Sequence, residues 1–123
     1  MVNKEVKTRY TDEELEEFNI LITEKLRKAK EQLSFYMSQL NDIHDNPDSK
    51  IKGLDDGIFT AESERVTNMA SRQKKLIQHL ENALIRIKNK VYGVCRETGK
   101  LISKERLRAV PHATLSIEAK QKN

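Results

Sequence analysis

The chain has 123 residues, of which 34% are charged and 37% are hydrophobic, and it contains no tryptophan. With a mean hydropathy of -0.73, this composition leaves little apolar material for a thick globular core and favours an elongated helical protein. The net charge is +4, and acidic and basic residues alternate along most of the chain. That alternation argues against a uniformly basic surface for nucleic acid.

The single cysteine, Cys95, cannot form an internal disulfide, and the sequence has no apolar run long enough for a signal peptide or a membrane span. We therefore expect a soluble cytoplasmic protein. Residues 1–10 are polar and lack helical periodicity. They are predicted to form a flexible N-terminal arm.

The next stretch predicts a long helix. Thr11 is followed three residues later by Glu14, which is the capping-box pattern, and acidic residues fill the first turn. Apolar residues then recur at intervals of three and four, which keeps them on one helix face. They are Leu15, Phe18, Ile22, Leu26, Ala29, Leu33, Tyr36, Leu40 and Ile43.

Residues 44–58 interrupt this periodicity and predict the tip of a helical hairpin. Pro47 cannot continue a helix, and Asn, Asp, Ser and Gly residues around it supply turn chemistry. The tip ends in Leu54, Asp55, Asp56 and Gly57. This acidic tip is the main candidate for function, although aspartates also serve simply as turn and helix-cap residues.

A second apolar stripe follows the tip and predicts a second helix that ends near Tyr92 and Gly93. Two stripes of similar length can bury each other if the helices fold back antiparallel, as a coiled-coil hairpin over residues 11–92 with arms of about 45 Å. The stripe residues are Phe59, Val66, Met69, Leu76, Leu80, Ala83 and Ile87. The fold class is therefore mainly α.

Residues 93–123 predict a small separate unit. We expect a turn at residues 95–99, a short hairpin at residues 100–107 and a final helix near residues 114–120, after Pro111. A unit of this size buries little apolar surface, so it needs a metal, a disulfide or a neighbouring element for stability.

Two motifs in this unit carry a family resemblance. Residues 92–102 read Y-G-V-C-R-E-T-G-K-L-I, and residues 106–113 read R-L-R-A-V-P-H-A. Together with the K-K-L-I run at residues 74–77, they resemble the bacterial TraR/DksA family over nearly the whole chain. The family's four-cysteine zinc finger implies ligands at the positions that here carry Cys95, Thr98, Ser116 and Ala119.

Only one of these four positions holds a thiol, and a structural zinc site needs four ligands. We therefore expect zinc to be absent and the finger-like unit to be held together by packing, with Cys95 as a small buried residue. His112 is interpreted as an ordinary loop histidine. His79 and His44 are expected to lie far from it, along the hairpin.

The resemblance implies a regulator that binds RNA polymerase and inserts its coiled-coil tip into the enzyme's secondary channel to modulate initiation. Longer family members carry a D-x-x-D-x-A pattern at the tip. Aligned through the finger, these positions hold Lys52, Asp55 and Gly57, and Asp56 adds a second acid beside Asp55. An acid at the tip can approach a metal-rich active site, where charge interactions strengthen as water is excluded.

Some family members respond to guanosine tetraphosphate where the coiled coil meets the globular unit. The aligned positions here carry Leu76, His79, Val110 and Lys120, so two of the usual basic partners are missing. The sequence does not favour that response. It predicts instead a basic edge for polymerase or nucleotide contact, made of Arg72, Lys75, His79, Arg106 and Lys120.

The sequence also allows other functions. The principal alternative is a coiled-coil interaction or assembly protein that pairs between chains and does not bind polymerase, whereas the regulator is expected to be a monomer. A nucleic-acid-binding module is a further alternative, but the sequence shows no aromatic stacking platform and no basic recognition helix, so sequence-specific DNA binding is not expected. No nucleophile and base pair or phosphate-binding loop indicates an enzyme.

Overall fold

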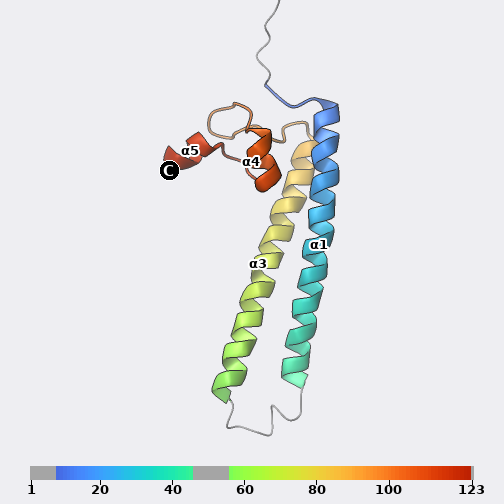
Figure 1. The fold of residues 1–123 in the computed structure, drawn as a ribbon, viewed down its shortest axis with the longest axis vertical. Helices are drawn as coiled ribbons and strands as arrows, with labels where there is room; N and C mark the ends of the chain where they lie inside the picture. Colours follow the sequence, from blue (N-terminus) through green and yellow to red (C-terminus); the bar gives the residue numbers. More distant parts are fainter. Residues whose placement is uncertain (1–7, 46–55, 123) are drawn as a thin grey trace, which may run out of the picture. The chain divides into compact units, whose positions relative to one another are not determined.

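A computed structural model describes residues 8–45 and 56–122 of the chain. Four helices lie in these residues: α1 (Asp12–Asp45), α3 (Asp56–Lys88), α4 (Lys104–Ala109) and α5 (Ile117–Lys122), as Figure 1 shows. In the described part of the chain, none of the helices combines the length and the apolar character that crossing a membrane requires.

The chain forms two compact units, and α1 and α3 contribute to both. One unit comprises Leu26–Gln78, in which segments of α1 and α3 lie side by side and run in opposite directions (Figure 1). Its buried apolar residues include Leu26, Ala29 and Val66, which belong to the two predicted stripes, and Ala70, which lies beside the second stripe. The predicted mainly α fold with a long helical hairpin is thereby confirmed.

The predicted tip at residues 44–58 is only partly described. Helix α1 continues to Asp45 and α3 begins at Asp56, whereas residues 46–55, including Leu54 and Asp55, lie outside the described residues. The predicted division into residues 1–10, 11–92 and 93–123 stays a prediction.

The other unit joins Met1–Lys25 to His79–Asn123. Helix α1 begins here with the predicted capping box: the Glu14 amide donates to Thr11 Oγ1 at 3.1 Å, and the Thr11 amide donates to Glu14 Oε1 at 2.9 Å. The two bonds satisfy backbone donors that the first helical turn leaves without intrahelical partners.

Three aromatic residues form the centre of this unit. The Phe18 ring lies between the rings of Tyr10 and Tyr92, with centroid distances of 6.1 and 5.3 Å. All three side chains are buried. The Tyr10 hydroxyl donates to the carbonyl oxygen of Ile102, and the Tyr92 hydroxyl donates to that of Pro111 at 2.8 Å. These bonds tie the segments after α3 to the start of α1.

Helix α3 ends at Lys88, four residues before the predicted end near Tyr92 and Gly93. Lys90 has a φ of 65°, its amide donates to Ile87 O at 3.0 Å, and the Val91 amide donates to Arg86 O at 2.9 Å. This is the Schellman arrangement, with a lysine at the left-handed position that glycine usually occupies. The predicted end was wrong because it was assigned from Gly93, whereas Lys90 takes the left-handed position.

The short hairpin also lies earlier than predicted. Val94 and Leu101 form an isolated antiparallel bridge, and the Cys95 amide donates to Lys100 O at 2.8 Å. Residues 104–107, predicted to belong to the hairpin, lie in α4 (Lys104–Ala109) instead, because Ser103 caps this helix by accepting a bond from the Arg106 amide. The short hairpin and the terminal helix α5 confirm the predicted content of the small unit.

Salt bridges also connect the start of α1 to the later segments of this unit. Asp12 pairs with Lys90 at 2.8 Å and Glu14 pairs with Lys104 at 2.7 Å. The acidic first turn thus stabilises its own helix end and holds the segments after α3.

Candidate functional site

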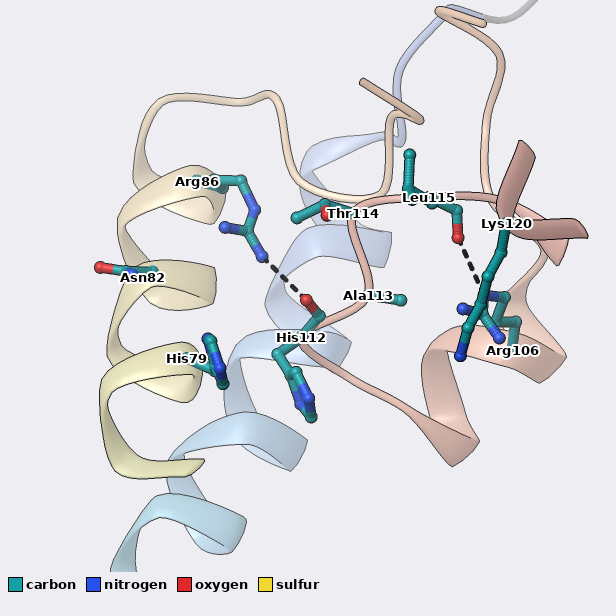
Figure 2. A pocket seen from close by; sticks show the side chains of 9 residues that line it. All are labelled: His79, Asn82, Arg86, Arg106, His112, Ala113, Thr114, Leu115 and Lys120. Atoms are coloured by element: carbon teal, nitrogen blue, oxygen red, sulfur yellow. Dashed lines mark hydrogen bonds between the residues drawn. The ribbon is translucent and has the colours of Figure 1, made fainter. Parts of the chain in front are cut away.

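A cavity of about 270 Å³ in the unit of Met1–Lys25 and His79–Asn123 is the candidate functional site (Figure 2). Helices α3, α4 and α5 contribute lining residues, and so does the segment that connects α4 to α5. The lining residues are His79, Asn82, Arg86, Arg106, His112, Ala113, Thr114, Leu115 and Lys120.

Two arginines hold the connecting segment against the helices. Arg86 Nη2 donates to the carbonyl oxygen of His112 at 3.3 Å, and Arg106 Nε donates to that of Leu115 at 2.9 Å (Figure 2). Both guanidinium groups are half-buried. Because a guanidinium has several N–H donors, each arginine can hold the segment and still present donors to a ligand.

Two histidines stack on one wall of the cavity. The ring centroids of His79 and His112 are 5.2 Å apart, and the planes differ by 8° (Figure 2). The Nδ1 atom of His112 is buried and has no hydrogen-bond partner among the described residues. Burial, together with the nearby His79 and Arg86, lowers the pKa of His112. The His112 ring is therefore neutral at pH 7.

The cavity is cationic. Arg86, Arg106 and Lys120 line it, and no carboxylate is present among its described lining residues. Burial lowers the pKa of Arg86, yet a guanidinium stays charged under all ordinary conditions. Such a wall offers charge-assisted hydrogen bonds to an oxyanion and repels a metal cation.

The predicted basic edge is only partly assembled in this cavity. His79, Arg106 and Lys120 line it. Arg72 and Lys75 are exposed on α3 in the unit of Leu26–Gln78 and do not belong to the lining. Whether these two residues act with the other three stays a prediction.

Two features of the site were not predicted from the sequence: the contact between His79 and His112, and the place of Arg86 in the lining. The expectation that His79 lies far from His112 is wrong, because the segment after α4 folds back onto the last turns of α3. Arg86 was not singled out either. The sequence does indicate that Arg86 lies near His79. His79, Asn82 and Arg86 follow a spacing of three and four, which places them on one face of a helix.

The four finger positions come together beside a second cavity. The Ser116 amide donates to Cys95 Sγ at 3.4 Å, and Cys95 is buried. Hydrogen bonds from the Thr98 side chain and the Ser116 backbone lower the pKa of the Cys95 thiol to about 6. The other three positions, Thr98, Ser116 and Ala119, line a cavity of about 210 Å³.

Residues 90–123 match the family model of the prokaryotic dksA/traR C4-type zinc finger. The chain is also 39% identical over 66 residues to the RNA polymerase-binding transcription factor DksA of Caulobacter vibrioides, covering 52% of this chain and 46% of that protein. General stress protein 16O of Bacillus subtilis is 37% identical over 62 residues, covering 49% and 38%. These matches span less than half the length of either relative.

The fold has a counterpart among solved structures. The structure of transcription factor DksA2 from Pseudomonas aeruginosa matches with a TM-score of 0.80 at 28% identity. The match covers 88% of this chain and 81% of that chain, so the similarity extends well beyond residues 90–123.

The zinc-finger family match overturns the expectation that zinc is absent. The expectation was wrong because it weighed only the number of thiols, whereas the match assigns the whole segment to a zinc-finger family. The residues themselves do not fit a C4 site. Thr98 and Ser116 offer hydroxyl groups and Ala119 a methyl group at three of the four ligand positions, where the site needs thiolates. The described residues contain no group of three or more His, Cys, Asp or Glu side chains that could hold a metal.

Proposed function

Because this chain belongs to the TraR/DksA family, we propose that it is a transcription regulator that binds RNA polymerase and has no catalytic activity of its own. The observation that carries this proposal is the match to DksA2, which covers 88% of the chain. The name of the Caulobacter relative, which states polymerase binding, supports it. A protein with this partner would work in the bacterial cytoplasm, as a monomer.

The proposed working end is the acidic tip, Leu54-Asp55-Asp56-Gly57, inserted into the secondary channel of the polymerase. Its support is the position of these residues in the sequence: Leu54 and Asp55 precede α3, Asp56 and Gly57 begin it, and all four follow the 34-residue helix α1. A carboxylate carried by a narrow helical hairpin can interact with the metal ions and basic side chains of a buried active site, where low dielectric strengthens the interaction.

The basic cavity is the proposed contact edge. Arg106, His79 and Lys120 line it together with Arg86, and all four can donate hydrogen bonds to an anionic group on the polymerase surface or on a bound nucleotide. Arg72 and Lys75, which are exposed on α3, are proposed as further contact residues for the polymerase.

The test compares the native chain with Asp55→Asn, Asp56→Asn and the double variant in two assays: binding to purified RNA polymerase and transcription from a regulated promoter. Asp42→Asn is the matched control, since it removes an exposed carboxylate from α1 outside the tip. We expect the double variant to bind as the native chain does and to lose the regulatory effect, while the control keeps both.

Two outcomes contradict the proposal in different ways. Loss of binding in the tip variants would make the acids part of the docking surface and not the working end. Failure of the native chain to bind core enzyme or holoenzyme would favour the assembly protein, for which sedimentation would detect association that increases with concentration.

A further inference from the structure

An exposed aromatic ring lies on the same side of the helical hairpin as a group of cations, within the unit of Leu26–Gln78. We propose that this face binds single-stranded nucleic acid without sequence preference: a base stacks on the ring and the cations pair with phosphates. The face, called the hairpin face below, consists of Lys28, Phe35, Arg65, Arg72 and Lys75. The proposal goes beyond polymerase binding and does not depend on it.

Phe35 provides the aromatic surface. It is 57% exposed on α1, and its ring contacts the Tyr36 ring in a tilted arrangement with a centroid distance of 5.8 Å. The sequence predicted no aromatic stacking platform, whereas the structure exposes this ring. A single exposed apolar residue is common on protein surfaces, so the charges around the ring decide what it can bind.

The five residues lie on one side of the hairpin. Each comes one position before a member of the three-four seam of its helix, so each lies on the same flank of that seam. The two helices run in opposite directions, and a twofold rotation perpendicular to their common plane relates them. Such a rotation keeps equivalent flanks on the same side of the pair. The seam positions concerned are Ala29 and Tyr36 on α1 and Val66, Gln73 and Leu76 on α3.

The five residues also lie at similar heights along the hairpin. Lys28 lies 17 residues before Asp45, the last residue of α1, and Arg72 lies 16 residues after Asp56, the first residue of α3. Phe35 and Arg65 lie 10 and 9 residues from the same two helix ends. At about 1.5 Å per residue, the ring is about 10 Å from the level of Lys28, a distance that a few nucleotides can span.

The positive charge of the hairpin face is not offset by nearby acidic residues. Residues 65–80 of α3 contain no aspartate or glutamate, and residues 25–41 of α1 contain one carboxylate, that of Glu31, which pairs with Arg27. No salt bridge among the described residues involves the four cations of the face. Because like charges repel, the face disfavours a second copy of itself and favours a polyanion.

A single strand of nucleic acid supplies both groups that the hairpin face can bind. Its phosphates accept charge-assisted hydrogen bonds from lysine and arginine, and each base has a π-face that can stack on Phe35. In a duplex the bases already stack on each other and cannot reach the ring. An acidic protein segment supplies negative charge but no base. The face therefore fits a single strand best.

The first experiment measures binding of the full chain to a fluorescein-labelled oligouridylate of about 16 nucleotides by fluorescence anisotropy at several chloride concentrations. Each phosphate contact contributes about −0.7 to the slope of log affinity against log salt, so the four cations should give a slope of about −3. Lys75→Gln should make the slope smaller by about 0.7. Lys74→Gln is the matched control on another side of α3 and should leave the slope unchanged. No binding at about 50 mM chloride, or a slope near zero, would overturn the proposal.

The second experiment tests stacking. Phe35→Leu keeps an apolar side chain without a π-face and should weaken binding about tenfold, whereas Met37→Leu, at a position that is 39% exposed, should have no effect. Phe35→Trp introduces the only tryptophan of the chain, and its fluorescence should be quenched when a base stacks on it. Equal affinities of the native chain and Phe35→Leu would overturn the proposal, and so would unchanged fluorescence of bound Phe35→Trp.

Three further ligands identify the partner. Oligothymidylate of the same length distinguishes DNA from RNA, and the polymer that binds more tightly is the assigned one. A duplex that binds as tightly as the single strand would overturn the proposal in favour of a purely electrostatic contact. Polyglutamate that loses affinity equally in Phe35→Leu would overturn it in favour of an acidic protein partner. All these measurements use the chain without polymerase, so they are independent of the proposed function.

Discussion

Replacing Gly93 by alanine should destabilise the unit that contains the cavity far more than the same change at Gly99. Both glycines have a positive φ, of 80° and 72°, which disfavours a side chain by about 1–2 kcal/mol. At Gly93 the new Cβ would lie 2.6 Å from Tyr10 Cε2 and 3.2 Å from Leu107 Cδ1. Overpacking of this kind costs about 1–3 kcal/mol more, because the Tyr10 ring is buried against Phe18.

Gly99→Ala is the matched control, since its Cβ would meet no atom within 4 Å. Urea unfolding followed by circular dichroism should give a loss of about 2–5 kcal/mol for Gly93→Ala and about 1–2 kcal/mol for Gly99→Ala. Equal losses in the two variants would refute the argument that the Tyr10 ring is held firmly over Gly93. A smaller loss at Gly93 than at Gly99 would refute it as well.

Three further changes test other contacts. Thr11→Ala removes one half of the capping box and should lower the free energy of unfolding by about 1 kcal/mol in urea titrations, whereas Thr11→Ser should retain most of it. Tyr92→Phe leaves the buried Pro111 carbonyl without its donor and should cost about 1–3 kcal/mol by the same measurement; an unchanged midpoint would contradict the bond. The lowered pKa of His112 means that the folded chain binds fewer protons than the unfolded chain. Stability should therefore be full above about pH 6.5 and fall as the pH drops through the folded pKa, and thermal melts of His112→Gln should lose this part of the pH dependence.

The helical hairpin was predictable because its signals are local. The capping box at Thr11 and Glu14 and the spacing of the two apolar stripes depend on residues a few positions apart. The structure buries stripe residues from both helices, including Phe18, Ile22, Val66 and Leu80. Such patterns predict which face of a helix is buried. Because the two apolar faces have similar lengths, pairing of the two helices with each other is the simplest way to bury both.

The details of the small unit were less predictable because they depend on tertiary contacts. The end of α3 follows from a left-handed lysine, Lys90, and not from the more permissive Gly93. Glycine at position 93 is required instead by the close approach of the Tyr10 ring, which joins residues distant in the sequence. The spacing of residues along the chain does not predict that the Tyr10 ring approaches Gly93.

The candidate site was predicted in part. The family alignment pointed to His79 and Lys120, and the predicted basic edge added Arg106. The structure places all three around one cavity. The stacking of His79 on His112 was missed, because the reversal of the segment after α4 depends on bonds from Arg86 and Arg106 to backbone carbonyls. Asp55 lies outside the described residues, so its role remains a prediction from sequence.

The bond between Tyr10 and Ile102 joins residues 92 positions apart, and this separation imposes an order on folding. At a synthesis rate of roughly 5–20 residues per second, Ile102, which provides the acceptor, is made several seconds after Tyr10. The residues of Leu26–Gln78 are complete before then and can pair over shorter separations. The unit that carries the cavity is therefore the last to form, and closing its long loop costs about 4 kcal/mol of chain entropy. A nascent chain released before residue 102 would contain most of the hairpin sequence but could not build the cavity.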